Sequence, residues 1–158
     1  MPSLIWQSLK FVGVAVPVSL TFLDNVGCLA RVQGSSMLPT LQGDQTARDY
    51  IWLNALAVRN FIVNRGDIVA FTSPSDPSRI LIKRVIALEG DTVRTLTYKQ
   101  SVVEVQQGCM WVEGDNRDLS MDSNTFGAIP RGLLLGVATH IVWPPSRWSR
   151  LKQDCRSR

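Results

Sequence analysis

Two serines in a short loop are the first residues whose type and setting could support catalysis. Ser35 and Ser36 lie in the segment 34–41, GSSMLPTL, between the end of a candidate strand and a turn that Pro39 restricts. A hydroxyl in such a place can be exposed while neighbouring backbone N–H groups face a reacting carbonyl oxygen. The same spacing is also typical of an ordinary loop serine, so the loop alone leaves both interpretations open.

A nucleophilic serine needs a base, and His140 is the single histidine of the chain. It lies in an apolar, alternating segment, which favours a structural histidine in the core or at its rim. Lysine can replace histidine where burial lowers its pKa. Strand alternation in 79–88, RILIKRVIAL, places Lys83 on one face with Leu81 and Val85. Burial there would favour the neutral amine, whereas a lysine that snorkels from an edge strand is the alternative.

Arg84 follows Lys83 and points to the opposite face, where it can pair with a carboxylate. Carboxylates are dense in 114–127, GDNRDLSMDSNTFG. This segment does not fit a calcium loop, because Ser123 stands where an EF-hand requires glycine. Its many Asp, Asn and Ser residues instead predict a tight loop that hydrogen-bonds to itself.

Short apolar runs separated by turn signals follow the first thirty residues and predict a mainly β, antiparallel domain. The segment 53–62 fits either a strand or a helical turn. The expected strands are 30–33, 50–53, 67–71, 80–88, 92–97, 102–105, 110–112 and 137–143.

The N-terminal segment contains thirteen uncharged residues, 11–23, with the sequence FVGVAVPVSLTFL. We expect one transmembrane helix over about 4–23, with Lys10 reaching toward one interface and Pro17 tolerated inside the span. A buried core helix and a cleaved secretory signal ending near Cys28 are the two alternatives that the residues leave open.

The net charge of +4 is located at the C-terminus. Residues 146–158 carry five basic side chains and one acidic side chain, so the rest of the chain is neutral. A neutral body argues against nucleic acid as a partner. The expected organisation is an N-terminal anchor segment over 1–29, a catalytic domain over 30–145 and a basic tail over 146–158.

The three cysteines, Cys28, Cys109 and Cys155, have no CxxC pair and no histidine at ligand spacing. This pattern predicts no metal site, and it is typical of incidental thiols. A single disulfide stays open.

Together these segments resemble the type I signal peptidase family of Ser/Lys proteases, and most closely its mitochondrial inner membrane members. The shared motifs, in family order, are SMLPTL (36–41), RGDIV (65–69), IKRVIALEGD (82–91), WVEGDN (111–116) and SMDS (120–123). The likeness to the mitochondrial members rests on VAVPV (14–18), TFLD (21–24), ATHIVWPP (138–145) and RW (147–148). The resemblance implies a signal-peptidase-like partial β-barrel.

The resemblance also assigns roles to individual residues. It implies that Ser36 is the nucleophile, that Lys83 is the general base, and that Ser120 orients the lysine amine. Asp122 would brace the site with Arg84 as its partner. No cofactor or metal is implied.

Two positions depart from the family pattern. Gly34 stands where relatives often carry an oxyanion-binding hydroxyl, so Ser35 or a backbone N–H group would have to replace that donor. Asn124 stands where bacterial relatives often place an arginine beside the aspartate, which implies a simpler brace that relies on Arg84.

The implied function is that of a single-pass serine endopeptidase of the mitochondrial inner membrane. Its catalytic domain would face the intermembrane space and remove sorting signals, with small residues near the cleavage point. Its partners would be preprotein substrates, the lipid bilayer and a sister catalytic subunit. A non-catalytic structural subunit is the alternative, whereas a DNA-binding, self-cleaving regulator would need an N-terminal helix-turn-helix in place of the apolar helix.

Overall fold

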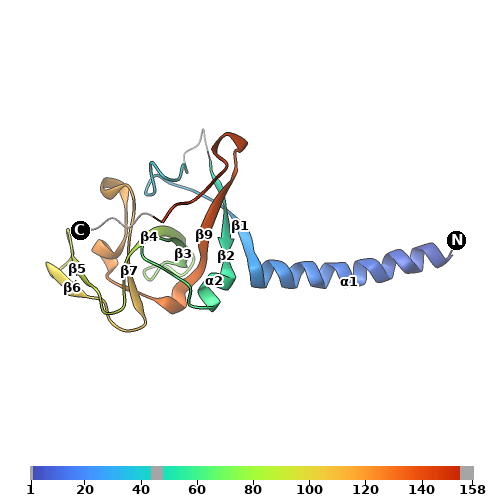
Figure 1. Cartoon of the computed structure of the whole chain (residues 1–158), viewed down its shortest axis with the longest axis horizontal. Helices are drawn as coiled ribbons and strands as arrows, with labels where there is room; N and C mark the ends of the chain where they lie inside the picture. The colour runs from blue at the N-terminus through green and yellow to red at the C-terminus, as the bar shows by residue number, and fades with distance from the viewer. Residues whose placement is uncertain (1, 44–47, 154–158) are drawn as a thin grey trace.

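One long helix projects from a β domain (Figure 1). The structure, a computed structural model, describes residues 2–43 and 48–153. The helices are α1 (Pro2–Val26), α2 (Ala55–Arg59) and α3 (Ser123–Phe126), with short 3-10 turns at Arg117–Leu119, Arg131–Leu133 and Pro145–Arg147. The strands are β1 (Gly27–Arg31), β2 (Tyr50–Asn54), β3 (Ile68–Thr72), β4 (Ile80–Leu88), β5 (Thr92–Arg94), β6 (Val102–Glu104), β7 (Cys109–Glu113), β8 (Ile129–Pro130), β9 (Leu134–Trp143) and β10 (Ser149–Arg150).

An eight-stranded antiparallel sheet organises the domain. Its strand order is β1-β2-β9-β3-β4-β7-β8, with β10 added beside β9, while β5 and β6 form a separate hairpin. The register shifts within the pairs β2–β9, β3–β9 and β4–β7, and such bulges increase the local twist of a sheet. The prediction of a mainly β, antiparallel fold is confirmed.

The eight expected strands are all present, with shifted ends in most cases. The segment 53–62, for which the sequence fits either a strand or a helical turn, contains both: β2 ends at Asn54 and α2 follows. The Asn54 side chain caps this helix by accepting a hydrogen bond from Ala57 N at 3.2 Å. The two strands that sequence patterns did not predict, β8 and β10, have two residues each, which is too short for alternation to be recognised.

The central strand β3 is buried on both faces and separates two apolar clusters. Ile68 and Ala70 join the first cluster, and Val69 and Phe71 join the second. The first cluster also contains Met37 and Leu41, Ile51 and Leu53 of β2, and Ile141 of β9. The loop that carries the two candidate serines is therefore rooted in the core.

Helix α1 extends away from the sheet (Figure 1), and the helix expected over 4–23 is present. Large apolar side chains along it, among them Phe11, Val14 and Val18, are exposed. Within the described residues, no helix combines the length and the apolar character needed to cross a bilayer. The anchoring role of this segment stays a prediction.

Packed residues continue past position 145. The sequence predicts a basic tail from residue 146, but β10 pairs with β9 through Ser149 and Arg150. Leu151 packs against the first apolar cluster and donates its N–H to Thr139 O at 2.8 Å. Counting charges could not show this packing, because it depends on residues far away in the sequence.

Candidate active site

The structure brings Ser36 and Lys83 together across 47 positions of sequence. Lys83 Nζ lies 2.7 Å from Ser36 Oγ and donates a hydrogen bond to it. The Lys83 side chain is nearly enclosed, with 3% of the residue exposed. A hydroxyl and an amine at this distance can exchange a proton directly.

Lys83 owes its position to the middle of β4, where it pairs with Val69 of β3. Burial lowers the pKa of Lys83 from its ordinary value of 10.5 to about 8, and the negative charge of Asp122 opposes that shift. A minority of the amine, though far more than for an ordinary lysine, is therefore neutral near physiological pH, and the neutral form can accept a proton from a hydroxyl.

Hydrogen bonds to its backbone atoms fix the loop that carries Ser36. Gly34 adopts φ +84°, a conformation that favours glycine, and donates its N–H to Gly43 O at 3.2 Å. Ser36 O accepts from Asn116 N at 3.0 Å, and Ser35 O accepts from Asn116 Nδ2 at 3.2 Å. The loop is thus tied to the segment after β7.

Gly114 allows that segment to approach the loop. A Cβ atom at this position would overlap Ser120 Oγ and the carbonyl oxygen of Ser36. Any larger residue at position 114 would therefore separate the Ser36 loop from the segment that carries Ser120 and Asp122.

Asp122 is buried and fully engaged by hydrogen-bond donors. Its Oδ2 accepts from Gly114 N at 3.0 Å and from Ser120 Oγ at 2.8 Å. Its Oδ1 accepts from Asn124 N at 3.0 Å and from Asn124 Nδ2 at 3.1 Å. The bond from Asn124 N makes Asp122 the N-cap of α3. The Ser120 hydroxyl thus donates to Asp122, and its proposed role in orienting the lysine amine stays a prediction.

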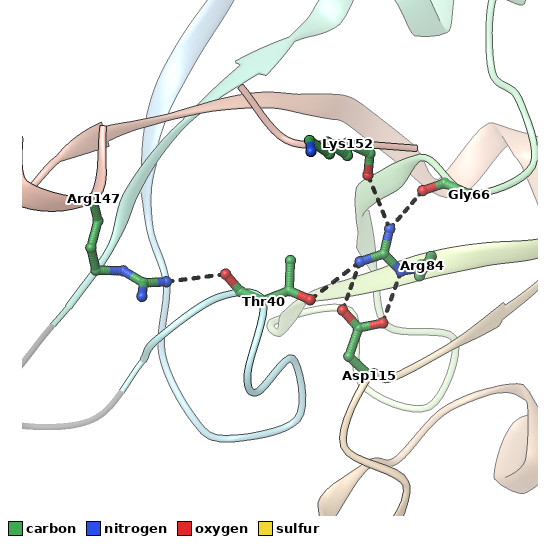
Figure 2. Close-up of polar contacts among 6 residues, drawn as sticks. All are labelled: Thr40, Gly66, Arg84, Asp115, Arg147 and Lys152. Carbon is green, nitrogen blue, oxygen red and sulfur yellow. Dashed lines mark hydrogen bonds and ion pairs between the residues drawn. The ribbon is translucent and has the colours of Figure 1, made fainter. Parts of the chain in front are cut away.

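The expected pairing of Arg84 with Asp122 is wrong. Arg84 forms a forked ion pair with Asp115 instead, with Nε–Oδ1 and Nη2–Oδ2 distances of 2.8 and 2.7 Å (Figure 2). Both side chains are 2% exposed. Asn124 binds Asp122 in place of Arg84, because its backbone N–H and its side-chain Nδ2 both donate to Asp122 Oδ1.

The candidate oxyanion residues are Gly34 and Ser35, which directly precede Ser36. Ser35 is half-buried, and its carbonyl is bound by Asn116 as described. A Cβ atom on Gly34 would meet nothing within 4 Å, so the positive φ rather than crowding explains glycine at this position. The role of Ser35 in binding an oxyanion stays a prediction.

A groove of about 680 Å³ adjoins Ser36 and Lys83. Its walls come mainly from β1, the Ser36 loop and β4, and its aliphatic lining includes Ala30, Val32 and Ile82. A groove with an aliphatic lining beside a nucleophile can hold an extended peptide segment.

Other residues considered from the sequence take no part in this geometry. His140 is exposed on β9, where its Nδ1 lies 3.0 Å from Thr139 Oγ1, so it is a rim histidine. Cys28 and Cys109 are free thiols, and Cys155 lies outside the described residues.

Sequence reasoning did not assign roles to Gly114, Asp115, Asn116 or the pair Asp49–Arg147. The first three belong to the family-like motif at 111–116, so that motif is the signal that could have found them. Arg147 belongs to the family-like RW motif at 147–148. Its pairing with Asp49 had no local signal, because 98 positions separate the two residues in sequence.

Comparison with known proteins now defines the class. The chain matches the family model described as signal peptidase, peptidase S26, over residues 5–99 and 94–143. It therefore belongs to the S26 signal peptidase family.

Within that family the chain is similar to mitochondrial inner membrane protease subunit 2. It is 57% identical to the Mus musculus protein over 140 residues, which is 88% of this chain and 80% of that one. It is 46% identical to the Saccharomyces cerevisiae protein over 137 residues, 84% of this chain and 77% of the relative. Subunit 1 from Homo sapiens is 38% identical over 132 residues, covering 82% and 77% of the two chains.

Proposed function

We propose that this protein is a serine endopeptidase in which Ser36 is the nucleophile and Lys83 the general base. The observation that carries the proposal is the 2.7 Å contact between Ser36 Oγ and a buried amine whose pKa is lowered to about 8. Membership of the signal peptidase family supports the same chemistry.

The reaction proceeds through an acyl-enzyme. Ser36 Oγ bonds to the scissile carbonyl carbon while its proton passes to neutral Lys83 Nζ. The amide C–N bond then breaks, and the leaving amine takes that proton from Lys83. Lys83 next takes a proton from water as the hydroxide oxygen attacks the ester, and Ser36 recovers its proton when the ester bond breaks.

The substrates are sorting sequences of proteins delivered to the mitochondrial intermembrane space. The names of the relatives support a protease of the mitochondrial inner membrane, and the groove beside Ser36, with its aliphatic lining, suits an extended peptide segment. We further propose that the exposed apolar side chains of α1 attach the protein to the inner membrane, with the catalytic domain in the intermembrane space. The similarity to both subunit 1 and subunit 2 supports a sister catalytic subunit as the partner.

Cleavage of presequence peptides by the full chain together with its sister subunit tests the proposal. The sister subunit is used in a serine-to-alanine form, so that any cleavage comes from this chain. Ser36→Ala and Lys83→Met should each lower kcat by at least about 10³-fold. Lys99→Met is the matched control, because Lys99 is exposed in a loop and should keep full activity.

A second measurement separates the enzyme from a structural subunit. The wild-type chain should be labelled by a serine-directed acylating probe, and Ser36→Ala should not be. Cleavage by folded Lys83→Met at the wild-type rate would refute the dyad. A wild-type chain that is never labelled, yet stabilises an active sister subunit, would establish the structural role instead.

A further inference from the structure

The C-terminal strap, defined as residues 145–153, lies beside the loop that carries Ser36. It is fixed to the sheet by the β9–β10 pairing and by the hydrogen bond from Leu151 N to Thr139 O at 2.8 Å. The Leu151 side chain packs against the apolar cluster that contains Met37 and Leu41. The strap therefore reaches the same cluster that roots the Ser36 loop.

Arg147 connects the strap to that loop by hydrogen bonds. Its Nε and Nη2 atoms donate to the two carboxylate oxygens of Asp49 at 2.9 and 3.0 Å. Nη2 also donates to Thr40 O at 3.1 Å (Figure 2). One guanidinium thus binds a buried carboxylate and a carbonyl oxygen four residues after Ser36.

Asp49 extends this connection to the end of the loop. It is 0% exposed, and its Oδ2 accepts from Gln42 N at 2.8 Å, while its own N–H donates to Gln42 O at 2.8 Å. The backbone from Thr40 to Gln42 is therefore held between Asp49 and Arg147.

The start and the end of the Ser36 loop are thus held by different parts of the molecule. Asn116 binds the carbonyls of Ser35 and Ser36. Arg147 and Asp49 bind the end of the loop, and Arg84 Nη2 adds a longer contact of 3.4 Å to Thr40 Oγ1. A displacement of about 1 Å in a catalytic group can lower the rate about 10²-fold, so contacts that fix this loop can affect the reaction rate without touching the substrate.

We propose that Arg147 is a positioning residue for the proposed peptidase reaction. It acts through Thr40 O and Asp49 and keeps Ser36 Oγ within proton-transfer distance of Lys83. Arg147 touches neither the reacting atoms nor the groove, so its loss should affect kcat and leave substrate binding intact. The inference rests on the proposed Ser36–Lys83 function and assigns that site a support in the C-terminal strap.

Steady-state kinetics on a fluorogenic presequence peptide test the proposal, with the full chain and the serine-to-alanine sister subunit. Arg147→Gln should lower kcat about 10- to 100-fold and change KM by less than about twofold. Arg150→Gln is the matched control, because Arg150 is an exposed residue of the same strap and its loss should leave both parameters unchanged. Arg147→Lys should recover part of the lost kcat, because an ammonium can pair with Asp49 but lacks the fork that also reaches Thr40 O.

A second variant keeps the test decisive if Arg147→Gln does not fold. The double variant Asp49→Asn/Arg147→Gln leaves no unpaired charge in the interior, and it should fold and show the same loss of kcat. Circular dichroism on each variant verifies folding. Wild-type kcat in a folded Arg147→Gln or double variant would overturn the inference. Failure of the proposed function is a different result, in which the wild-type chain itself neither cleaves the peptide nor reacts with the acylating probe.

Discussion

Lys83 and Arg84 are neighbours on β4, both are cations, and both are almost completely buried, at 3% and 2% exposure. Their surroundings differ. Arg84 has a forked contact to the Asp115 carboxylate and a further hydrogen bond to Gly66 O at 2.8 Å. Lys83 contacts the Ser36 hydroxyl, and Asp122 acts on it only as a nearby charge.

This difference shows what burial does to a cation. A carboxylate in direct, two-point contact offsets the desolvation of Arg84, so its guanidinium can serve as a structural connection between β4 and the segment after β7. A hydroxyl offers no opposite charge, so desolvation dominates at Lys83 and its pKa decreases. One strand therefore presents a structural cation and a candidate base at consecutive positions.

Replacing Arg84 should produce the largest effect on stability. Arg84→Met removes the forked ion pair and its positive charge from beside the buried Asp115 carboxylate, so we expect the free energy of unfolding to decrease by about 3–5 kcal/mol. Urea denaturation measures the change, and Arg79→Met, at an exposed position just before β4, should stay within about 0.5 kcal/mol of wild type. Equal stability of Arg84→Met and wild type would contradict the structural role.

Replacing Lys83, in contrast, should raise the free energy of unfolding. Below pH 8 the folded protein must keep a buried ammonium, so Lys83→Met should raise the free energy of unfolding by about 1–3 kcal/mol at pH 7. Between pH 8 and 10.5 the folded state is neutral at Lys83 while the unfolded state still binds a proton, so wild-type stability rises with pH. The advantage of Lys83→Met over wild type should therefore shrink across that interval in denaturation curves, and a constant difference would exclude the shifted pKa.

The pH dependence of cleavage tests the same amine during catalysis. The ratio kcat/KM should rise about tenfold per pH unit below the pKa of Lys83 and level off above about pH 8, because only the neutral amine accepts the Ser36 proton. His140→Ala should show the same profile, since this histidine is exposed on β9. A midpoint that moves in His140→Ala would show that the titration belongs to His140 and not to Lys83.

Asp122→Asn should move the midpoint of that profile by a small amount. The charge of Asp122 raises the pKa of Lys83, so its removal should move the midpoint of the profile below pH 8. The asparagine retains an oxygen for Gly114 N or Ser120 Oγ, which preserves part of the local structure. A pH titration of kcat/KM in this variant, compared with Asp118→Asn at an exposed position, measures the shift, and a higher midpoint would reverse the assigned sign.

Local pattern predicted most of the fold because strands leave periodic signals. All eight expected strands exist, and β4 has the expected bounds. The resemblance to signal peptidases indicated Ser36 and Lys83, and the structure places these two residues in contact. The same reasoning paired Arg84 with the wrong carboxylate, since Asp115 and Asp122 lie in one acidic segment and only the path of the chain distinguishes them.

Which residues could react, and where strands would form, follow from the sequence alone, because side-chain chemistry and strand periodicity depend on each residue and its neighbours. Which cation is paired, which is desolvated, and how the C-terminal strap contacts the Ser36 loop depend on the folded chain. Burial and ion pairing arise between residues that are distant in sequence, such as Asp49 and Arg147. A local sequence pattern cannot show which distant residues come into contact.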